Sequence, residues 1–211
     1  MKKQLEKNNY HHDNLKSELI QKGLKILDKD GYDSFSLRKV AKACGVTQTA
    51  PYRHFKNKDE LIAAIALEVS RKFDDVLQKA VDKFPDDPRK QLREMGCAYM
   101  EFFVRNPEYL RLMFLSNLRQ KMNFDETGLA YRISDYEGTG HPFETFYKTV
   151  ERYKNKYHSK KNDAMTLEEL ILYCWGLVHG IAILISRKDF QYEGDSMELA
   201  RKIMWNESFL D

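Results

Sequence analysis

The sequence predicts an all-α protein, and three observations support this fold class. Apolar residues recur at three- and four-residue intervals along most of the chain, which is the period of an amphipathic helix. No segment shows the sustained alternation of apolar and polar residues that is typical of a strand. The 10 glycines and 5 prolines are few among 211 residues, and they stand at breaks between the periodic segments. We therefore expect helices joined by turns.

Two predicted helices open the chain. Residues 14–30 carry leucine and isoleucine at helical spacing, with Asp13 as the expected N-cap and Gly31 where a left-handed residue ends a helix. Ser36 is the expected cap of a short second helix over residues 37–44, whose apolar positions follow the same period. We expect the two helices to pack on each other through these apolar faces.

A third helix is predicted from Gln48 to Phe55, although it contains a proline. Gly45 provides the turn before it, and Thr47 is its expected N-cap. Pro51 then falls in the first turn, where a missing backbone N–H is expected to cost little. The proline is therefore compatible with a helix that begins at Gln48, and a loop is the alternative.

The later helices are predicted from capping pairs and from breaks. Asn57 with Glu60, and Thr166 with Glu169, have the spacing of a capping arrangement. Residues 118–140 are expected to form a long irregular connection. The helices expected in this part of the chain are 58–81, 88–105, 107–117, 142–157, 167–187 and 196–209.

Charge is distributed unevenly along the chain. The formal net charge is +3, but the first 60 residues alone hold 13 basic and 8 acidic side chains, a balance of +5. Between Ser36 and Lys58 six residues are basic and none is acidic. A basic run centred on short helices is typical of a surface that binds a polyanion, and a plain solvated surface is the alternative. The six residues are Arg38, Lys39, Lys42, Arg53, Lys56 and Lys58.

The segment LRKVAKACGVTQTAPYRHFK is typical of a helix-turn-helix. Ala41 is small enough for two short helices to approach, and Gly45 permits a tight turn between them. In such a unit the second helix presents its first residues to the major groove of DNA. Gln48 suits a base edge, and the residues after it suit a thymine methyl group or the phosphate backbone. The alternative, a helical hairpin packed in a core, is disfavoured by the acid-free charge run.

The same residues resemble a known family, the TetR/AcrR-like transcriptional regulators. The resemblance covers residues 10–65 and rests on the motifs SLRKVA, GV, YRHF and KNKDEL. Further along, WGLVHG, from Trp175 to Gly180, resembles the Trp–His–Gly signature of one subgroup, whose opening is similar to YHHDNLKSELI. Pro51 departs from the leucine or isoleucine common in the family, which leaves the base contacts beside it less defined.

The resemblance implies an architecture and a set of DNA contacts. Residues 1–58 would form an N-terminal arm and a three-helix DNA-binding domain, and residues 59–211 a helical ligand-binding and dimerisation domain. A homodimer would bind a palindromic double-stranded DNA operator as a repressor, and a small apolar or amphipathic effector would release it. The residues expected at the DNA are Ser36, Arg38, Thr47, Gln48, Thr49, Ala50, Tyr52, Arg53, His54, Lys56 and Lys58.

The C-terminal half is expected to hold both the effector and the second subunit. The run from Leu170 to Ile185 is too apolar for an ordinary surface helix, and Gly176 and Gly180 would let another helix come close. We expect the last two helices of each subunit to form a four-helix dimer interface; burial within one subunit is the alternative. The effector pocket is expected among Tyr99, Phe103, Met113, Phe146, Tyr147, Tyr173, Trp175 and His179.

Other functional classes find little support in the sequence. The apolar run is shorter than the roughly 20 residues of a membrane span, so we expect a buried helix and no membrane contact. Without a secretory signal, and with three separated cysteines, we expect a cytoplasmic protein. No nucleophile with a placed base, HExxH motif or phosphate-binding glycine loop occurs, so we expect no enzyme activity, cofactor or metal. A helical carrier or enzyme without an operator is the alternative, and a helical interaction protein is a third.

Overall fold

Helices make up the regular structure of the protein. The computed structural model describes residues 2–115, 142–158, 165–187 and 189–206. Within those ranges every regular element is a helix and no strand occurs. The predicted all-α class is therefore confirmed for the described part of the chain.

The chain divides into two compact units. The N-terminal unit contains Met1–Val69 together with Arg111–Asp125, and the C-terminal unit contains Ser70–Leu110 together with Glu126–Asp211. The division falls inside a single helix, α3 (Lys58–Asp82), which contributes residues to both units. The functional boundary predicted between residues 58 and 59 lies before this division, and it stays a prediction.

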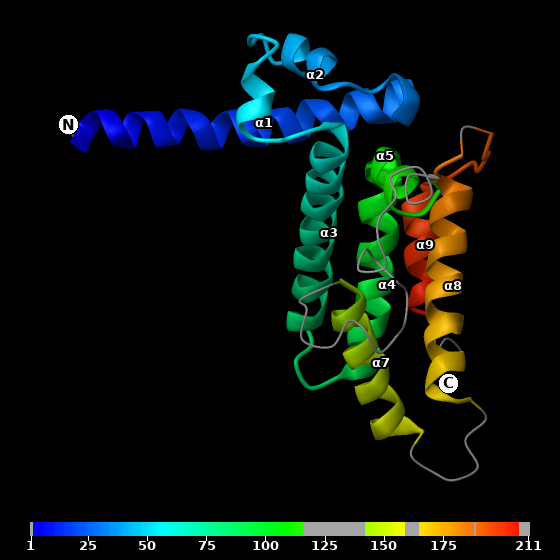
Figure 1. Ribbon diagram of the computed structural model, residues 1–211. Coiled ribbons are helices and arrows are strands. Elements are labelled where there is room, and N and C mark those ends of the chain that lie inside the picture. Colours follow the sequence, from blue (N-terminus) through cyan, green and yellow to red (C-terminus); the bar gives the residue numbers. More distant parts are fainter. Residues whose placement is uncertain (1, 116–141, 159–164, 188, 207–211) are drawn as a thin grey trace. The chain divides into compact units, whose positions relative to one another are not determined.

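The N-terminal unit is built from helices packed around one apolar core. Its elements are α1 (Lys2–Ser34), α2 (Leu37–Ala43), the short 3₁₀ helix η1 (Ala50–Arg53), the first part of α3, and the π-helical segment η2 (Arg111–Leu115). Figure 1 shows α2 beside α1, as their apolar faces predict. The core contains Leu19, Leu24, Leu27, Phe35, Leu37, Val40, Ala41, Phe55, Leu61 and Ile65, each at most 6% exposed.

Helix α1 begins earlier than predicted. The sequence predicts an N-cap at Asp13, but the helix starts at Lys2, so Asp13 lies inside it. The reason is that no glycine or proline occurs before Gly23, while lysine, glutamine and glutamate are good helix formers. The predicted end is correct, because Gly31 has φ 71° and interrupts the helical backbone.

The third predicted helix is also shorter than expected, and Pro51 explains the difference. In an α-helix capped by Thr47, the amide of residue 51 would donate to the Thr47 carbonyl, and a proline has no such amide. The Thr47 carbonyl instead accepts from Ala50 N at 3.0 Å, which is 3₁₀ geometry. The predicted helix from Gln48 to Phe55 is therefore replaced by η1, and the predicted Thr47 cap is wrong.

The C-terminal unit contains a group of helices centred on α4. Its elements besides the end of α3 are α4 (Pro88–Arg105), α5 (Pro107–Leu110), α7 (Pro142–Tyr157), α8 (Leu167–Ile185) and α9 (Ser196–Met204). Helix α4 packs against α7, α8 and α9, and α7 also packs against α8 (Figure 1). The starts predicted from Pro88 and Pro142 are confirmed.

The capping pairs predicted from the sequence are present. Asn57 Oδ1 accepts from Glu60 N at 2.9 Å at the start of α3. At the start of α8, Thr166 Oγ1 accepts from Glu169 N, and the Glu169 carboxylate accepts from Thr166 N at 2.7 Å. Helix α9 ends at Met204, before the predicted residue 209. The connection expected over residues 118–140 lies outside the described residues.

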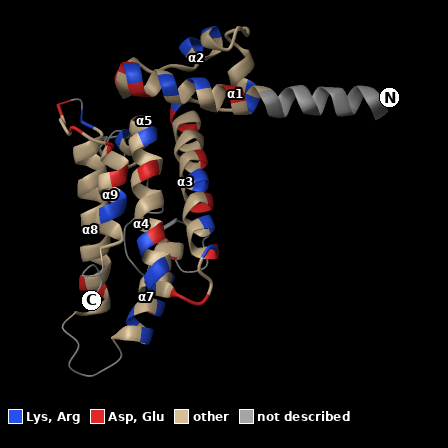
Figure 2. Cartoon of the chain, turned by 180° about the vertical axis from the view of Figure 1, so that it is seen from behind, with Lys and Arg blue, Asp and Glu red and all other residues tan. Residues whose placement is uncertain are grey.

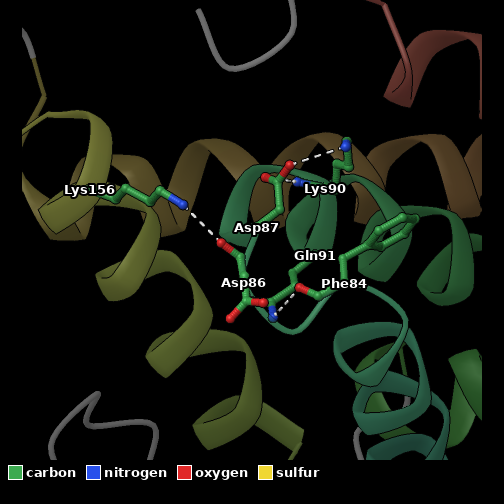
Figure 3. A network of polar contacts seen from close by, with 6 residues as sticks. All are labelled: Phe84, Asp86, Asp87, Lys90, Gln91 and Lys156. Atoms are coloured by element: carbon green, nitrogen blue, oxygen red, sulfur yellow. Dashed lines mark hydrogen bonds and ion pairs between the residues drawn. The ribbon is translucent and has the colours of Figure 1, made fainter.

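A polar network fixes the turn between α3 and α4 (Figure 3). The Gln91 side chain is buried, and its amide nitrogen donates to the Phe84 carbonyl at 2.8 Å. Asp87 caps α4 by accepting from Lys90 N at 3.1 Å. From α7, Lys156 Nζ donates to the Asp86 carbonyl at 2.8 Å. These bonds join the turn to α4 and α7 and give the Phe84 and Asp86 carbonyls hydrogen-bond partners.

Candidate nucleic-acid interface

The turn between α2 and η1 is defined by backbone geometry. Ser36 Oγ accepts from Lys39 N at 3.3 Å and caps α2, as predicted. Gly45 has φ 69°, a left-handed conformation that side chains with a Cβ adopt at a cost. Val46 N then donates to the Ala41 carbonyl at 3.1 Å. The chain therefore turns sharply between the two short helices, which is the geometry of a helix-turn-helix.

Helix η1 and the two residues after it have a buried side and an exposed side. Pro51 and Phe55 are buried, whereas Tyr52 is 52% exposed and Arg53 is also exposed. Of the other residues predicted at the DNA, Arg38, Thr47, Gln48, Thr49 and Lys56 are exposed, and Ser36, Ala50, His54 and Lys58 are half-buried. All eleven thus lie at least partly on the surface, and none is in the core.

An acidic residue of α1 neutralises part of the positive charge on this surface. Figure 2 shows lysine and arginine on α2. Of these, Lys39 forms an ion pair with Asp30 at the end of α1, with 2.9 Å between Nζ and Oδ2. The hydrogen bond from Lys39 lowers the pKa of the Asp30 carboxyl below its ordinary value. Arg38 and Lys42 are exposed on the same helix. The acid-free run in the sequence therefore overstates the charge of the folded surface.

Lys58 is held by a residue far away in the sequence. Its Nζ lies 3.8 Å from the centroid of the Tyr32 ring and donates to the Tyr32 carbonyl at 3.3 Å. The Tyr32 hydroxyl donates to Asp59 Oδ1 at 2.9 Å. The sequence does not predict this contact, because no local pattern links Tyr32 to Lys58, which lies 26 positions later.

An aromatic cluster in the C-terminal unit contains five of the eight residues predicted at the effector pocket. The Tyr99 hydroxyl and His179 Nδ1 form a hydrogen bond of 2.7 Å between α4 and α8. The His179 ring lies 6.4 Å from that of Trp175, and burial lowers the pKa of its imidazole. Phe103 packs on Tyr99 at 4.8 Å, and Phe146 is linked to Trp175 through Phe143.

The other three predicted pocket residues differ in their exposure and in the unit that holds them. Tyr173 is 50% exposed, Tyr147 is half-buried on α7, and Met113 lies in η2, which belongs to the N-terminal unit. Phe73 of α3 joins the cluster, with its ring 4.9 Å from Phe103, and was not predicted. The four-residue spacing of Val69, Phe73 and Leu77 along α3 was the available signal.

Helix α8 has one buried and one exposed apolar face. Leu170, Ile171, Cys174, Val178 and Ala182 are buried, whereas Leu172 is 71% and Leu184 is 53% exposed. A Cβ added at Gly176 or Gly180 would meet no atom within 4 Å. Among the described residues α8 is also the one helix long and apolar enough to cross a membrane, with 28% of its apolar window buried. The predicted burial of this helix is therefore correct for the face that contains Cys174 and Val178, whereas the face that contains Leu172 is exposed in one subunit.

Two of the three described cysteines, Cys97 and Cys174, are buried. Across residues 15–114 and the described parts after them, no group of three or more His, Cys, Asp or Glu side chains is placed to hold a metal ion. Cys97 and Cys174 are buried thiols, and burial raises the pKa of Cys174 to about 12. A thiol with so high a pKa is a poor nucleophile at neutral pH.

Two protein-family models match the chain. Residues 19–65 match the model described as "Bacterial regulatory proteins, tetR family". Residues 92–205, which are more than half of the chain, match the model described as "Tetracyclin repressor-like, C-terminal domain". The first match contains α2 and η1, and the second contains the helices that carry the Tyr99–His179 pair.

Two curated proteins are similar to part of the chain. The HTH-type transcriptional regulator AcrR of Shigella flexneri is 32% identical over 98 residues, which are 46% of this chain and 46% of AcrR. The HTH-type transcriptional repressor NicS of Pseudomonas putida is 20% identical over 111 residues, 53% of this chain and 52% of NicS. The matched region thus spans about half the length of these relatives.

Solved structures match over most of the chain. A TetR family transcription regulator from Marinobacter aquaeolei has a TM-score of 0.68 at 16% identity, over 93% of this chain and 96% of that one. The fatty acid degradation regulator FadR from Bacillus halodurans has a TM-score of 0.65 at 15% identity, over 90% and 92%. At these identities the likeness establishes the fold.

Proposed function

Because the chain belongs to the TetR family of bacterial regulatory proteins, we propose that it is a DNA-binding transcriptional regulator that responds to a small molecule. It acts as a homodimer on a palindromic operator. We propose that it is a repressor, because the similar protein NicS is named a transcriptional repressor. This activity places it in the cytoplasm, where the DNA lies.

The observation that carries this proposal is the exposed surface formed by α2, η1 and the start of α3. Tyr52 and Arg53 point away from a core that holds Pro51 and Phe55. Gln48 and Thr49 are exposed immediately before η1, where a recognition element meets base edges. Arg38, Lys42, Lys56 and Lys58 supply positive charge around it for the phosphates. All of the eleven predicted residues are proposed contacts.

The exposed face of α8 supports the proposed dimer. Leu172 and Leu184 leave an apolar surface in water along a helix whose mean hydropathy would suit a protein interior. Gly176 and Gly180 leave room for a close approach by a second helix. On α9, Ile203 is 37% exposed. We propose that two copies of α8 and α9 cover these residues in a four-helix interface.

The aromatic cluster supports the proposed effector site. Most of its members are apolar rings, and the Tyr99–His179 hydrogen bond supplies one polar pair among them. Apolar pockets with a few polar groups are typical of small-molecule sites. Trp175, His179 and Gly180 also form the Trp–His–Gly motif, and we propose membership of the subgroup that carries it.

Effector and operator are coupled by linkage in this proposal. A homodimer presents two copies of η1, and these must lie about 34–36 Å apart to enter successive major grooves. An effector that binds better to a dimer with another spacing lowers DNA affinity by the same factor as DNA lowers effector affinity. Helix α3 contributes residues to both units, so it is the proposed path of this coupling.

Selection of bound duplexes tests the proposal directly. The protein is incubated with a randomised pool of duplex DNA, and the enriched sequence is measured against a scrambled duplex over a range of salt concentrations. We expect a palindromic sequence to be enriched, with log K falling steeply and linearly with log salt. Equal affinity for the enriched and scrambled duplexes at every salt concentration would refute the regulator and favour a helical carrier or enzyme.

A further inference from the structure

Tyr32 makes three separate contacts with the first turn of α3. Its ring lies under the Lys58 ammonium, with 3.8 Å from Nζ to the centroid. Its carbonyl accepts a hydrogen bond from the same Nζ at 3.3 Å. Its hydroxyl donates to Asp59 Oδ1 at 2.9 Å. One residue therefore engages both the cation and the anion that open this helix.

The backbone of Tyr32 is itself fixed. Gly31 before it has φ 71°, which ends the regular helix and redirects the chain. The Tyr32 carbonyl also accepts from Phe35 N at 3.2 Å, and the Phe35 side chain is buried in the core. Tyr32 is thus a rigid support rather than a loose surface side chain.

This support changes what Lys58 can do. A lysine side chain loses up to about 2 kcal/mol of rotamer entropy when it is ordered. Here Tyr32 has already ordered it, so that cost is not incurred again when an anion binds. An ammonium has three N–H donors. The Tyr32 carbonyl takes one and the ring covers another side, which leaves a donor for a phosphate oxygen.

The Tyr32 hydroxyl has a separate effect, because it gives the Asp59 carboxylate a partner other than Lys58. A carboxylate beside Lys58 would compete for its ammonium and would repel a phosphate. The Tyr32 hydroxyl gives Asp59 another partner at 2.9 Å. A phenol is protonated at neutral pH and can therefore donate, and this hydrogen bond raises the pKa of the Tyr32 phenol further.

We propose that Tyr32 is a positioning residue of the DNA interface, which holds the Lys58 ammonium toward a backbone phosphate and keeps Asp59 from competing with it. This inference rests on the proposed DNA-binding function. It extends the interface to a residue of α1 that need not touch DNA.

A double-mutant cycle tests the role of the ring. The probe is the duplex that the unaltered protein enriches from a randomised pool. Lys58→Ala should weaken binding roughly eightfold at 0.1 M salt and lower the salt slope by about 0.9, the effect of one lost phosphate contact. Tyr32→Leu should weaken binding about two- to eightfold, and no more than Lys58→Ala does, because the Lys58 side chain must then be ordered when DNA binds. In the Lys58→Ala protein, Tyr32→Leu should have no further effect.

A second cycle tests the hydroxyl and does not depend on the ring being removed. Tyr32→Phe keeps the ring over Lys58 but releases Asp59, so it should weaken binding. Asp59→Asn removes the competing charge, and in that background Tyr32→Phe should cost nothing. This cycle decides the question even if Tyr32→Leu fails to fold, as judged by circular dichroism.

The outcomes separate this inference from the function on which it rests. If the unaltered protein shows no salt-sensitive binding to any duplex, the proposed function fails before any variant is compared. If the unaltered protein binds but Tyr32 substitutions cost the same factor with and without Lys58 and Asp59, Tyr32 serves the fold alone and the inference is overturned.

Discussion

Pro51 and Tyr52 are adjacent in the chain but have opposite environments. Pro51 is buried, and because it has no amide to donate, the Thr47 carbonyl accepts from Ala50 N in 3₁₀ geometry. Tyr52, the next residue, has more than half of its surface exposed. A tight element therefore presents its tyrosine away from the core, where the phenol can reach a phosphate or a base edge.

Replacement of Tyr52 tests this placement. Tyr52→Ala should weaken binding to the enriched duplex by roughly 1–3 kcal/mol, because a close contact is lost, with the fold unchanged. Tyr192→Ala is the matched control, since Tyr192 is 49% exposed in the C-terminal unit. Fluorescence anisotropy with the labelled duplex gives both affinities. An equal effect of the two substitutions would contradict the position assigned to η1.

His179 provides a residue-scale prediction about pH. Burial lowers the pKa of its imidazole below the ordinary 6.5, so the unfolded chain takes up a proton more readily than the folded protein. Stability should therefore fall as the pH drops below about 6.5. Urea unfolding at pH 7.5 and 5.5 measures this effect. Between these two pH values the free energy of unfolding should fall less in His179→Asn than in the unaltered protein. The same loss in both would mean that His179 titrates alike in the two states.

At the scale of elements, the turn after α2 depends on one glycine. Gly45 has φ 69°, and a residue with a Cβ in this region costs about 1–2 kcal/mol. Gly45→Ala should lower the free energy of unfolding by about that amount. Gly45→Asn is the matched variant, and it should lose less because asparagine tolerates left-handed backbone. Thermal unfolding followed by circular dichroism measures both, and an Asn variant as unstable as the Ala variant would count against the backbone explanation.

The turn between α3 and α4 depends on a buried side chain instead. Gln91 is 1% exposed, and its amide nitrogen donates to carbonyls of the turn while its oxygen accepts from Arg152. Gln91→Ala should destabilise the protein by about 1–3 kcal/mol, because buried polar groups lose their partner. Gln78→Ala, at an exposed glutamine bonded to Asp82, should change stability little. Denaturant midpoints compare the two, and similar losses would show that burial of the amide is unimportant.

The exposed face of α8 allows a test of the proposed dimer. Leu172→Glu should convert the proposed dimer to monomers, because a carboxylate would be buried without a partner in the interface. The matched control is Leu67→Glu on α3, since Leu67 is 72% exposed and Leu172 is 71% exposed. Sedimentation velocity gives the mass of each. A Leu172→Glu protein that stays dimeric would place the subunit contact elsewhere.

Loss of the dimer should also reduce DNA affinity. A monomer presents one copy of η1, so it loses the second half-site of a palindrome and the avidity that two linked sites provide. Tyr52 and the start of α3 are unaltered in Leu172→Glu, so its residual binding measures the contribution of one half-site. A loss of DNA affinity in Leu172→Glu would therefore connect the proposed interface on α8 with the surface at η1, although Leu172 lies on α8 and not at that surface.

The helical class and most helix boundaries could be predicted from the amino-acid sequence. Ser36, Asn57 and Thr166 act on amides within three residues, and the apolar period is equally local, so such signals can be read without a structure. It also predicted the packing of α1 against α2 through their apolar faces, because burial of apolar side chains dominates their environment.

The contacts that could not be predicted from the sequence join residues that are far apart in the chain. Lys58 lies on Tyr32, Tyr99 bonds His179, and Lys39 is paired with Asp30, although no local pattern joins these residues. The same is true of Leu172, whose exposure follows from which face of α8 the neighbouring helices cover. Periodicity predicts that a helix has an apolar face, but when a helix is apolar all round, packing alone selects the face that is left in water.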